Sequence, residues 1–538
     1  MSCSTVKKGT TMKNIRKFFL NAIILCAVSM LMRTVGVSFN IYVSNRAGAE
    51  AMGLYALLSS VYGFSVTFAT SGINFATMRL VAKALGKNDG QEASAVLKRC
   101  VIYSLFFSSV ATITLFSCSE FIGLKILNDE RTVLSLKILS ATLIPISLSS
   151  TFNGYFTAVK RVYKNAVIQV CEQAIKIFVV SSLLSLFLPK GIEFACAALA
   201  LGGGVAEISS FLLSGVAFLF DKKRTIKGSA TLKDRSYVTT ELMKTALPIA
   251  SSAYARSGLI SLEHMLIPIG LSKYGMNKSN SLAMYGVIQS MVLPIVLFPA
   301  ALISSFSGLL VPELTQCAVK NNNRQIRYIC ERSIQLALIF SIGTAGIMIC
   351  FSGELGSVIY PNENTSAYIK LLAPLIPIMY IDTTVDHMLK GLGEQFYSMI
   401  VNIADALLSV FLVWFLLPRF GIVGFIITIY ISELINASLS IVRLIKKSGF
   451  KTHLIKWIVK PLMCIAGSTC LCNIIFGFIT LNMCFPSIKL TIHILVALLA
   501  YVLMLGVTNS FDRDDILWLV KIFKSDRSIK SDACNHSS

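Results

Sequence analysis

Residues 396–442 read FYSMIVNIADALLSVFLVWFLLPRFGIVGFIITIYISELINASLSIV, two long apolar runs that meet at the sequence PRF, 418–420. The hydrocarbon core of a bilayer is about 30 Å thick, so a helix needs about 20 mainly apolar residues to cross it. Each run has that length, and the three residues between them leave room only for a tight connection. The stretch therefore predicts two consecutive membrane-spanning helices, at 396–417 and 421–442.

The same kind of run recurs along the whole chain. Of the 538 residues, 55% are apolar and only 14% are charged, and the mean hydropathy is +0.71, well above the range of soluble domains. We predict an all-α membrane protein with about fourteen transmembrane helices. The predicted spans are 19–43, 54–78, 101–122, 133–157, 165–188, 193–220, 242–270, 281–311, 333–352, 367–389, 396–417, 421–442, 457–480 and 487–509.

The basic residues lie mainly between the apolar runs. In a soluble protein the formal net charge of +22 would suggest nucleic-acid binding, but here the charges follow the predicted loops. We therefore expect no nucleic-acid partner. Loops on one side of the membrane carry most of the 49 Lys and Arg residues, as the positive-inside rule requires of cytoplasmic loops. This bias predicts a multi-pass protein with both termini in the cytoplasm.

The chain divides into two halves that look related. The longest internal loop, 221–241, is a basic linker with six predicted helices before it. AEISS at 206–210 resembles SELIN at 432–436, and Arg33 occupies the place in the first helix that Arg256 occupies in the seventh. Such a repeat is typical of alternating-access transporters, and chance similarity is the alternative. The predicted segments are a cytoplasmic tail 1–18, a six-helix bundle 19–220, the linker 221–241, a pseudo-symmetric six-helix bundle 242–445, two extra helices 446–510 and a cytoplasmic tail 511–538.

Ionisable residues inside the predicted spans are candidates for function. A charge that faces lipid costs about 3 kcal/mol, so as a group these residues must face protein or water. They are Arg33, Glu172, Lys176, Glu207, Arg256, Glu263, Asp382, Asp386, Asp405 and Glu433. Arg33 and Arg256 lie at matching places in the two halves, and a pair of guanidinium groups suits a phosphate or diphosphate, which it contacts in a bidentate way. A structural ion pair with a neighbouring carboxylate is the alternative for each.

The acidic members of this set are candidates for ion coupling. Asp382 and Asp386 are four residues apart, and two like charges on one helical face predict a wet site that attracts a cation or shares a proton. Glu172 and Lys176 have the spacing and order of a structural helical ion pair. The remaining candidates for ion-coupling or cavity acids are Glu207, Glu263 and Glu433.

The sequence contains no catalytic or cofactor-binding pattern. Its five histidines and fourteen cysteines show no metal-ligand spacing. A phosphate-binding loop motif is also absent, which makes ATP hydrolysis by this chain improbable. We expect a transporter without cofactor or metal, and not an enzyme, driven by an ion gradient, the membrane potential or the flux of substrate.

Several short motifs, taken in order, resemble one family of membrane proteins. They are GAEAMGLY at 48–55, SGI at 71–73, RLVA at 79–82, GYF at 154–156, FPA at 298–300, LVPEL at 310–314 and LKGLGEQ at 389–395. Over about residues 15–510 the chain resembles the polysaccharide transporter family, in its stage V sporulation protein B-like branch. This branch is part of the multidrug/oligosaccharidyl-lipid/polysaccharide (MOP) exporter superfamily, whose members form a V of two six-helix bundles around a cavity.

The resemblance implies a flippase for an undecaprenyl-pyrophosphate-linked oligosaccharide or a lipid II-like peptidoglycan precursor, in a bacterial plasma membrane. The lipid II flippases line their cavity with arginines on helices 1, 2 and 7, where this chain has Arg33, Arg79 and Arg256, although Arg79 also fits a topology charge. They guide the lipid tail with helices 13 and 14, here 457–480 and 487–509. The implied partners are a lipid-linked sugar and membrane lipids, with the chain working as a monomer in cell-wall, spore-cortex or surface polysaccharide synthesis.

Two other functions are open. A cation-coupled, MATE-like multidrug exporter of the same superfamily would share the fold, but it would favour an acidic and aromatic cavity, and Arg33 and Arg256 weigh against it. A membrane-embedded glycosyltransferase or polymerase would act on the same lipid-linked substrates. Such an enzyme normally carries its catalytic groups on a large external loop, and the sequence predicts none.

The charge bias predicts which side of the membrane three loops face. In a cysteine-free background, single cysteines at positions 225 and 450 should react with a membrane-impermeant thiol reagent only from the cytoplasmic side, and a cysteine at position 275 only from outside. Labelling is compared in intact spheroplasts and inverted vesicles. Because one missed crossing inverts every loop that follows, labelling of position 275 from the cytoplasm would show that the helix count is wrong.

Overall fold

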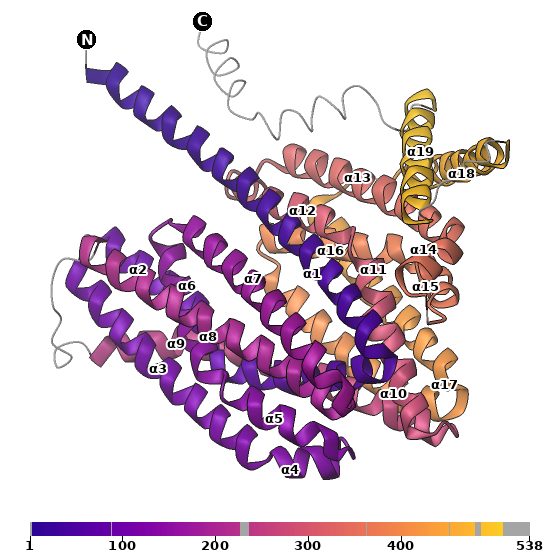
Figure 1. The fold of residues 1–538 in the computed structure, drawn as a ribbon. Coiled ribbons are helices and arrows are strands. Elements are labelled where there is room, and N and C mark those ends of the chain that lie inside the picture. Colours follow the sequence, from indigo (N-terminus) through magenta and orange to yellow (C-terminus); the bar gives the residue numbers. More distant parts are fainter. Residues whose placement is uncertain are drawn as a thin grey trace, which may run out of the picture. The chain divides into compact units, whose positions relative to one another are not determined.

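The computed structural model describes the chain with short gaps. The described ranges are 3–87, 89–225, 236–361, 363–450, 452–478, 486–508 and 510. Every regular element within these ranges is a helix, and no strand occurs in them (Figure 1). Apolar runs become helices because a membrane offers the backbone no hydrogen-bond partners, so the N–H and C=O groups must pair within the segment. The predicted all-α class is confirmed.

The helices follow one another with short connections. The elements up to residue 297 are α1 (Cys3–Thr70), α2 (Ile73–Gly86), α3 (Gly90–Ser117), α4 (Ser119–Phe121), η1 (Ile122–Ile126), η2 (Glu130–Thr132), α5 (Val133–Ser140), α6 (Leu143–Ala158), α7 (Val162–Phe187), η3 (Leu188–Lys190), α8 (Ile192–Thr225), α9 (Ser236–Lys273), α10 (Lys278–Gly286), η5 (Val287–Val292) and α11 (Leu293–Leu297). The later elements are α12 (Ala300–Val319), α13 (Asn323–Cys350), α14 (Ser352–Ile359), α15 (Ser366–Leu372), η6 (Ala373–Leu375), α16 (Ile376–Gly391), α17 (Gln395–Ser448), η7 (Ile455–Val459), α18 (Lys460–Phe478) and α19 (Pro486–Val507).

The number of membrane spans is not confirmed at fourteen. Within the described ranges, 11 helices are long and apolar enough to cross a membrane, or up to 12 if a bent pair counts as one span. Part of the difference lies in α1 and α17, which each hold two predicted spans in one continuous element. Each contains one residue with non-helical backbone angles, Gly48 (φ 80°, ψ 169°) in α1 and Gly421 (φ 57°, ψ −134°) in α17. Only glycine adopts such angles readily. The chain therefore bends at this one residue, and the helix continues on both sides of it.

Contacts within the chain divide it into two compact units. We call Val28–Ile295 with Met399–Ile435 the larger unit, and the remaining described residues the smaller unit. Linker residues 226–235 and the tail 511–538 lie outside the described residues. The bounds of the six predicted segments therefore stay predictions.

Buried polar contacts tie the helices of the larger unit together. Asp221 of α8 is only 3% exposed, and its carboxylate accepts hydrogen bonds from Tyr155 at 3.1 Å and Lys164 at 2.6 Å, and pairs with Arg161. A buried charge is costly unless it is paired and hydrogen-bonded. These three donors, from α6 and the start of α7, therefore fix the end of α8.

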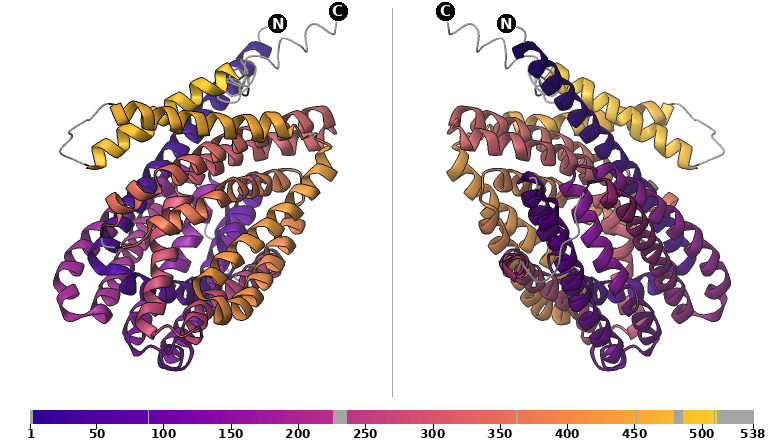
Figure 2. Two further views of the ribbon diagram at one scale, coloured as in Figure 1. Left: turned by 90° about the vertical axis from the view of Figure 1, so that its right-hand side faces the viewer. Right: turned by 90° about the vertical axis from the view of Figure 1, so that its left-hand side faces the viewer.

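Helix α13 is the centre of the smaller unit, where it packs against α12, α16 and α18. Two buried tyrosine hydroxyls donate to backbone carbonyls at 2.8 Å, Tyr380 to Val296 and Tyr501 to Ile339. Gly343 makes room for the second ring, since a Cβ there would lie 2.6 Å from it. Helices α18 and α19 pack side by side as a hairpin (Figure 2).

Two glycines let the backbones of α1 and α10 touch in the larger unit. A Cβ on Gly53 would lie 2.0 Å from the carbonyl oxygen of Leu282, and a Cβ on Gly286 would lie 2.1 Å from that of Ala49. Real Cβ atoms do not approach so closely. Any side chain at either position would push the two helices apart.

Gly53→Ala should therefore destabilise the protein by about 1–3 kcal/mol through overpacking. The matched control is Gly63→Ala in the same helix, where no atom lies within 4 Å of the new methyl group and where alanine favours the helix by up to about 1 kcal/mol. The measurement is the thermal unfolding midpoint of each variant purified in detergent. Equal midpoints for the two variants would contradict the close contact.

Candidate functional site

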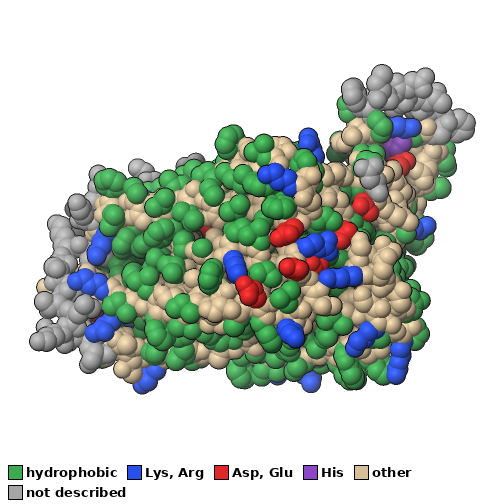
Figure 3. Space-filling model, turned by 60° about the horizontal axis from the view of Figure 1, so that its bottom comes forward, with side chains coloured by type: hydrophobic (Ala, Val, Ile, Leu, Met, Phe, Trp, Pro, Cys, Tyr) green, Lys and Arg blue, Asp and Glu red, His purple; other side chains and the backbone are tan. Residues whose placement is uncertain are grey.

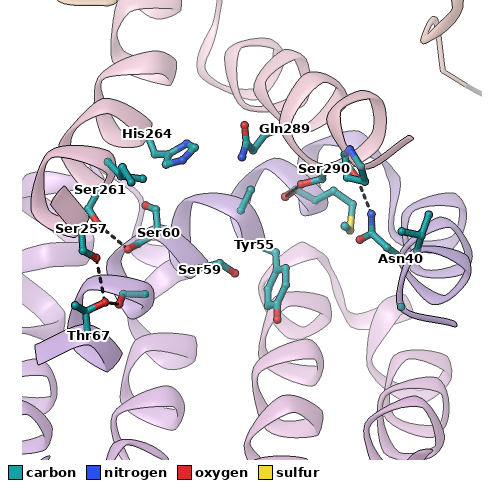
Figure 4. A pocket seen from close by; sticks show the side chains of 17 residues that line it. Asn40, Tyr55, Ser59, Ser60, Thr67, Ser257, Ser261, His264, Gln289 and Ser290 are labelled. Atoms are coloured by element: carbon teal, nitrogen blue, oxygen red, sulfur yellow. Dashed lines mark hydrogen bonds between the residues drawn. The ribbon is translucent and has the colours of Figure 1, made fainter. Parts of the chain in front are cut away.

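A cavity of about 610 Å³ lies within the larger unit (Figure 4). Its walls come from α1, α9, η5 and α11. The lining residues are Gly36, Val37, Asn40, Met52, Tyr55, Ala56, Ser59, Ser60, Gly63, Thr67, Ser257, Ile260, Ser261, His264, Gln289, Ser290 and Pro294. Hydroxyl and carboxamide groups are frequent among them, whereas Lys, Arg, Asp and Glu are absent from this set of described residues. The cavity is polar but carries no formal charge on its wall.

Two antiparallel helices form one wall of the cavity. The Thr67 and Ser257 hydroxyls are hydrogen-bonded at 3.2 Å, and the Ser261 hydroxyl donates to the carbonyl oxygen of Ser60 at 2.7 Å (Figure 4). Residue numbers fall along α1 as they rise along α9, so the helices run in opposite directions. Serine and threonine suit this seam because they are small enough for close approach and still bond across it.

Other polar groups of the wall have no protein partner. Within the described residues, no hydrogen bond is found for the side chains of Tyr55, Ser59 and Gln289, which surround the open space in Figure 4. By contrast, the Asn40 amide donates to the carbonyl oxygen of Ser290 at 2.6 Å, which fixes its direction. A buried polar group without a partner is costly, so the free groups must meet water or a ligand. The site offers a ligand uncharged donors and acceptors.

A second cavity of about 210 Å³ adjoins the first. The two share the lining residues Gly36, Asn40, Met52 and Tyr55. The opposite wall of the smaller cavity includes Gln173 and Lys176 of α7, and Lys176 is the one charged residue among its described lining residues. The larger, neutral space therefore continues into a smaller space that holds a positive charge.

The three predicted arginines lie outside both lining sets. Arg33 of α1, Arg79 of α2 and Arg256 of α9 are each exposed. Arg256 directly precedes the cavity residue Ser257, and its charge acts on the carboxylate of Asp405 in α17. Their role in binding substrate stays a prediction.

The acidic residues of the larger unit have defined neighbours. Glu263 accepts a hydrogen bond from Ser409 at 2.5 Å, and Asp405 accepts one from Ser432. The first contact joins α9 to the first arm of α17, and the second joins the two arms of α17 to each other. Glu207 of α8 is within the electrostatic reach of the charges on α7 described below.

The acidic residues of the smaller unit are also held by polar groups. Asp386 forms an ion pair with Lys390 at 3.0 Å and accepts a hydrogen bond from Ser398, while Asp382 accepts one from Asn436 at 3.2 Å. Lys390 thus offsets part of the repulsion expected between the two aspartates.

In the larger unit, Glu433 lies half-buried on α17. No group of three or more His, Cys, Asp and Glu side chains in the described residues could hold a metal ion.

Sequence reasoning missed the cavity because serine, threonine and tyrosine are common in membrane helices. A usable signal was present: Tyr55, Ser59, Gly63 and Thr67 recur every four residues, which places them on one face of a helix. A polar or small stripe of this kind inside an apolar run indicates a face that is not turned to lipid.

A charged cluster joins three connections of the larger unit. Arg131 contacts Glu50 and Asp129 at 2.8 Å each, Ser279 donates to Glu50 at 2.6 Å, and Lys278 lies 3.4 Å from Asp129. Figure 3 shows acidic and basic side chains next to one another on one face of the molecule. The cluster links the start of the cavity-lining arm of α1 to the start of α10. It therefore lies close to the contact between Gly53 of α1 and Leu282 of α10.

Asp129 keeps its charge at neutral pH. Burial alone would raise the pKa of its carboxyl group, but hydrogen bonds from Arg131 and the charges of Arg131 and Lys278 hold the pKa below its ordinary value of 3.8. A carboxylate with a depressed pKa stabilises the folded state above its ordinary pKa and loses this effect only as the pH falls through the lower value. The cluster is therefore fully charged throughout the physiological range.

The long apolar helices define a multi-pass membrane protein, and its relatives include flippases and transporters rather than enzymes. The chain belongs to the polysaccharide biosynthesis protein family, whose pattern it matches over residues 18–301. It also matches the MatE family over residues 259–415. Both matches are consistent with the MOP superfamily that the motifs indicated.

The relatives agree with this placement. The chain is 25% identical to stage V sporulation protein B of Bacillus subtilis (strain 168) over 411 residues, which cover 76% of this chain and 79% of that protein. It is 20% identical to the lipid II flippase MurJ of the same organism over 415 residues, 71% of this chain and 74% of that one. A solved structure of a lipid II flippase MurJ, in an inward closed conformation, has the same fold, with a TM-score of 0.69, 14% identity and coverage of 90% of this chain and 98% of that one.

Removal of the Arg131 charge should loosen the contact between α1 and α10. Arg131→Gln leaves Glu50 and Asp129 close together without their shared cation, and loss of a charge-assisted contact costs about 1.5–3 kcal/mol. We expect a cysteine at Ser59 in the cavity to react about tenfold faster with an impermeant thiol reagent added from outside. Lys137→Gln is the control, because Lys137 pairs at 2.8 Å with exposed Glu120 and not with the cluster. An unchanged labelling rate in Arg131→Gln would show that the cluster does not limit access to the cavity by holding α1 against α10.

Proposed function

We propose that this protein is a flippase that carries a lipid-linked sugar from the cytoplasmic to the outer leaflet of a bacterial plasma membrane by alternating access. The observation that carries the proposal is the cavity of about 610 Å³ with a polar but uncharged wall. Membership of the polysaccharide biosynthesis family supports the same substrate class, as does the similarity to a lipid II flippase. In this proposal both termini are cytoplasmic and the working unit is a monomer.

The wall of the cavity suits a sugar headgroup. Hydroxyl and carboxamide groups both donate and accept hydrogen bonds, and sugar hydroxyl and acetamido groups do the same. Tyr55, Ser59 and Gln289 supply such groups without a protein partner. Each hydrogen bond contributes only about 1 kcal/mol net, so binding depends on several of them together. The rings of Tyr55 and His264 add flat surfaces for the apolar face of a sugar ring.

The arginines Arg33, Arg79 and Arg256 are our proposed ligands for the diphosphate that links sugar to lipid. A diphosphate in a low-dielectric path needs compensating charge, and guanidinium groups supply it with less tightly held water than ammonium groups. Arg256 adjoins the cavity residue Ser257 on α9. A change in the tilt or rotation of α9 would therefore move both residues together.

The acids are proposed to couple transport to a proton or a cation. Glu263 joins α9 to the first arm of α17, and Asp405 joins the two arms of α17, each through a serine hydroxyl, so a change in their charge would alter these contacts. Asp382 and Asp386 of α16 contact α17 through Asn436 and Ser398. Glu207 and Glu433, the remaining acids of the proposed set, lie half-buried on α8 and α17.

The match to the MatE family over residues 259–415 favours one second candidate, a multidrug exporter. Such a protein binds cationic drugs and needs acidic groups at its cavity. The described lining of both cavities holds no Asp or Glu, and its one charge is that of Lys176. This charge pattern favours a sugar or an anion over a cationic drug.

Transport by purified protein in liposomes tests the proposal. Wild-type protein should flip a fluorescent polyprenyl-diphosphate-linked disaccharide, and no flipping above empty liposomes would refute the flippase function. Arg33→Ala and Arg256→Ala should each raise the substrate concentration at half-saturation by about ten- to a hundredfold, because a charge-assisted contact contributes about 1.5–3 kcal/mol. Arg33→Lys should restore only part of the loss, since an ammonium group cannot make the bidentate contact.

Arg46→Ala is the matched control for the arginine variants. Arg46 is an exposed arginine of the same helix as Arg33 and lies over the ring of Tyr42, outside both cavities. The Arg46→Ala variant should flip the disaccharide with the same half-saturation as the wild type. If Arg33→Ala and Arg256→Ala reach the liposomes in normal amounts and match this control, the two arginines do not bind the diphosphate.

A further inference from the structure

Lys176 is a cation within a membrane-spanning helix and forms no direct ion pair among the described residues. It lies half-buried in the middle of α7, which has the length and hydropathy of a membrane span. The predicted ion pair with Glu172, one turn earlier, does not form, and Lys176 has no ion-pair or hydrogen-bond partner among the described residues. A lysine facing lipid would cost about 3 kcal/mol. Instead, Lys176 lines the cavity of about 210 Å³.

Two acids lie near Lys176 but do not line the cavity. The charges of Glu172 and Lys176 both act on Glu207 of α8, which places these three groups close together. The lining of the smaller cavity includes Lys176 and the carboxamide of Gln173, and neither acid belongs to it. The acids therefore lie outside the described lining of the cavity, while the ammonium group of Lys176 faces the cavity and is available to a ligand.

From this arrangement we propose that Lys176 and Gln173 form an anion-binding subsite, and that one substrate occupies both cavities with its neutral sugar in the larger one and an anionic oxygen group at Lys176. The proposal rests on the flippase function proposed above and names a contact that the three arginines do not provide. The cavities share Asn40 and Tyr55, so a ligand can pass from one to the other without crossing a closed wall.

The chemistry at Lys176 fits an anion better than a further sugar hydroxyl. An ammonium group donates but cannot accept hydrogen bonds, and it is stabilised by anionic oxygen in a low-dielectric site. The flexible carboxamide of Gln173 can supply a second donor. The anionic oxygen belongs either to the phosphate next to the sugar or to a carboxylate on the sugar itself.

Binding of three lipid probes to purified protein distinguishes these sources. One probe is a polyprenyl-diphosphate-linked neutral disaccharide, the second a phosphate-free glycolipid with a uronic acid, and the third a phosphate-free neutral glycolipid. Lys176→Gln should weaken binding of an anionic probe by about ten- to a hundredfold, the range for loss of a charge-assisted contact, and should leave the neutral probe unchanged. Lys176→Arg should keep most of the affinity. A loss confined to the first probe assigns the subsite to phosphate, and a loss confined to the second assigns it to carboxylate.

Lys190→Gln is the matched control, because Lys190 is an exposed lysine just beyond the end of α7, over the ring of Phe187, and lines neither cavity. Removal of Lys176 leaves Glu172 and Glu207 without their neighbouring cation, so the double variant Lys176→Gln/Glu172→Gln is tested as well. It keeps the local net charge and should lose anion affinity to the same extent as the single variant. If Lys176→Gln and the double variant Lys176→Gln/Glu172→Gln both bind the anionic probes as tightly as the wild type does, the subsite is overturned. A wild type that binds none of the three probes would instead overturn the proposed function.

Discussion

A polar group that enters the hydrocarbon layer must find its partner in the protein or in enclosed water, because lipid supplies none. The arrangement of this protein depends on that constraint. Buried Asp221 has three donors from neighbouring elements, and Glu263 and Asp405 each have a serine hydroxyl from another helix or helix arm. Where apolar packing alone would leave the helices free to slide in a lipid environment, these directional contacts fix which faces meet.

The same constraint separates structural polar groups from functional ones. Groups that the protein satisfies, such as Asp386 with Lys390 and Ser398, hold elements in place. Some polar groups without a protein partner among the described residues, such as Gln289 and Lys176, line the two adjoining cavities. An unpartnered polar side chain is tolerated only where water or a ligand can reach it. The unpartnered groups at the cavities are therefore the candidates for contact with a substrate.

The fold was largely predictable, because long apolar runs permit few structures in a bilayer. The all-α class and the family followed from such runs and from ordered motifs. The span count was harder to judge, because a single glycine bend at Gly48 or Gly421 leaves two predicted spans in one helical element. The site was less predictable. Charges stand out in an apolar sequence, so reasoning began from Arg33 and Arg256, whereas both cavity walls consist mainly of residues that are unremarkable one by one. Lys176 was noticed but assigned to Glu172, since spacing along a helix gives no information about a third helix.

The bends at Gly48 and Gly421 also shape two seams, of which the one between α1 and α9 borders the larger cavity. The positive φ of Gly48 redirects α1, so that the arm after it can run antiparallel to α9 and place Tyr55, Ser59 and Thr67 on the cavity side. Gly421 redirects α17 in the same way, and a Cβ there would lie 2.8 Å from the ring of Tyr274 at the end of α9. Helix α9 is thus held to the arm of α1 after Gly48 and to the arm of α17 before Gly421 by hydrogen bonds that all involve serine or threonine hydroxyls. In an apolar surrounding such directional contacts, and not apolar packing alone, decide which face of α9 is turned to the cavity.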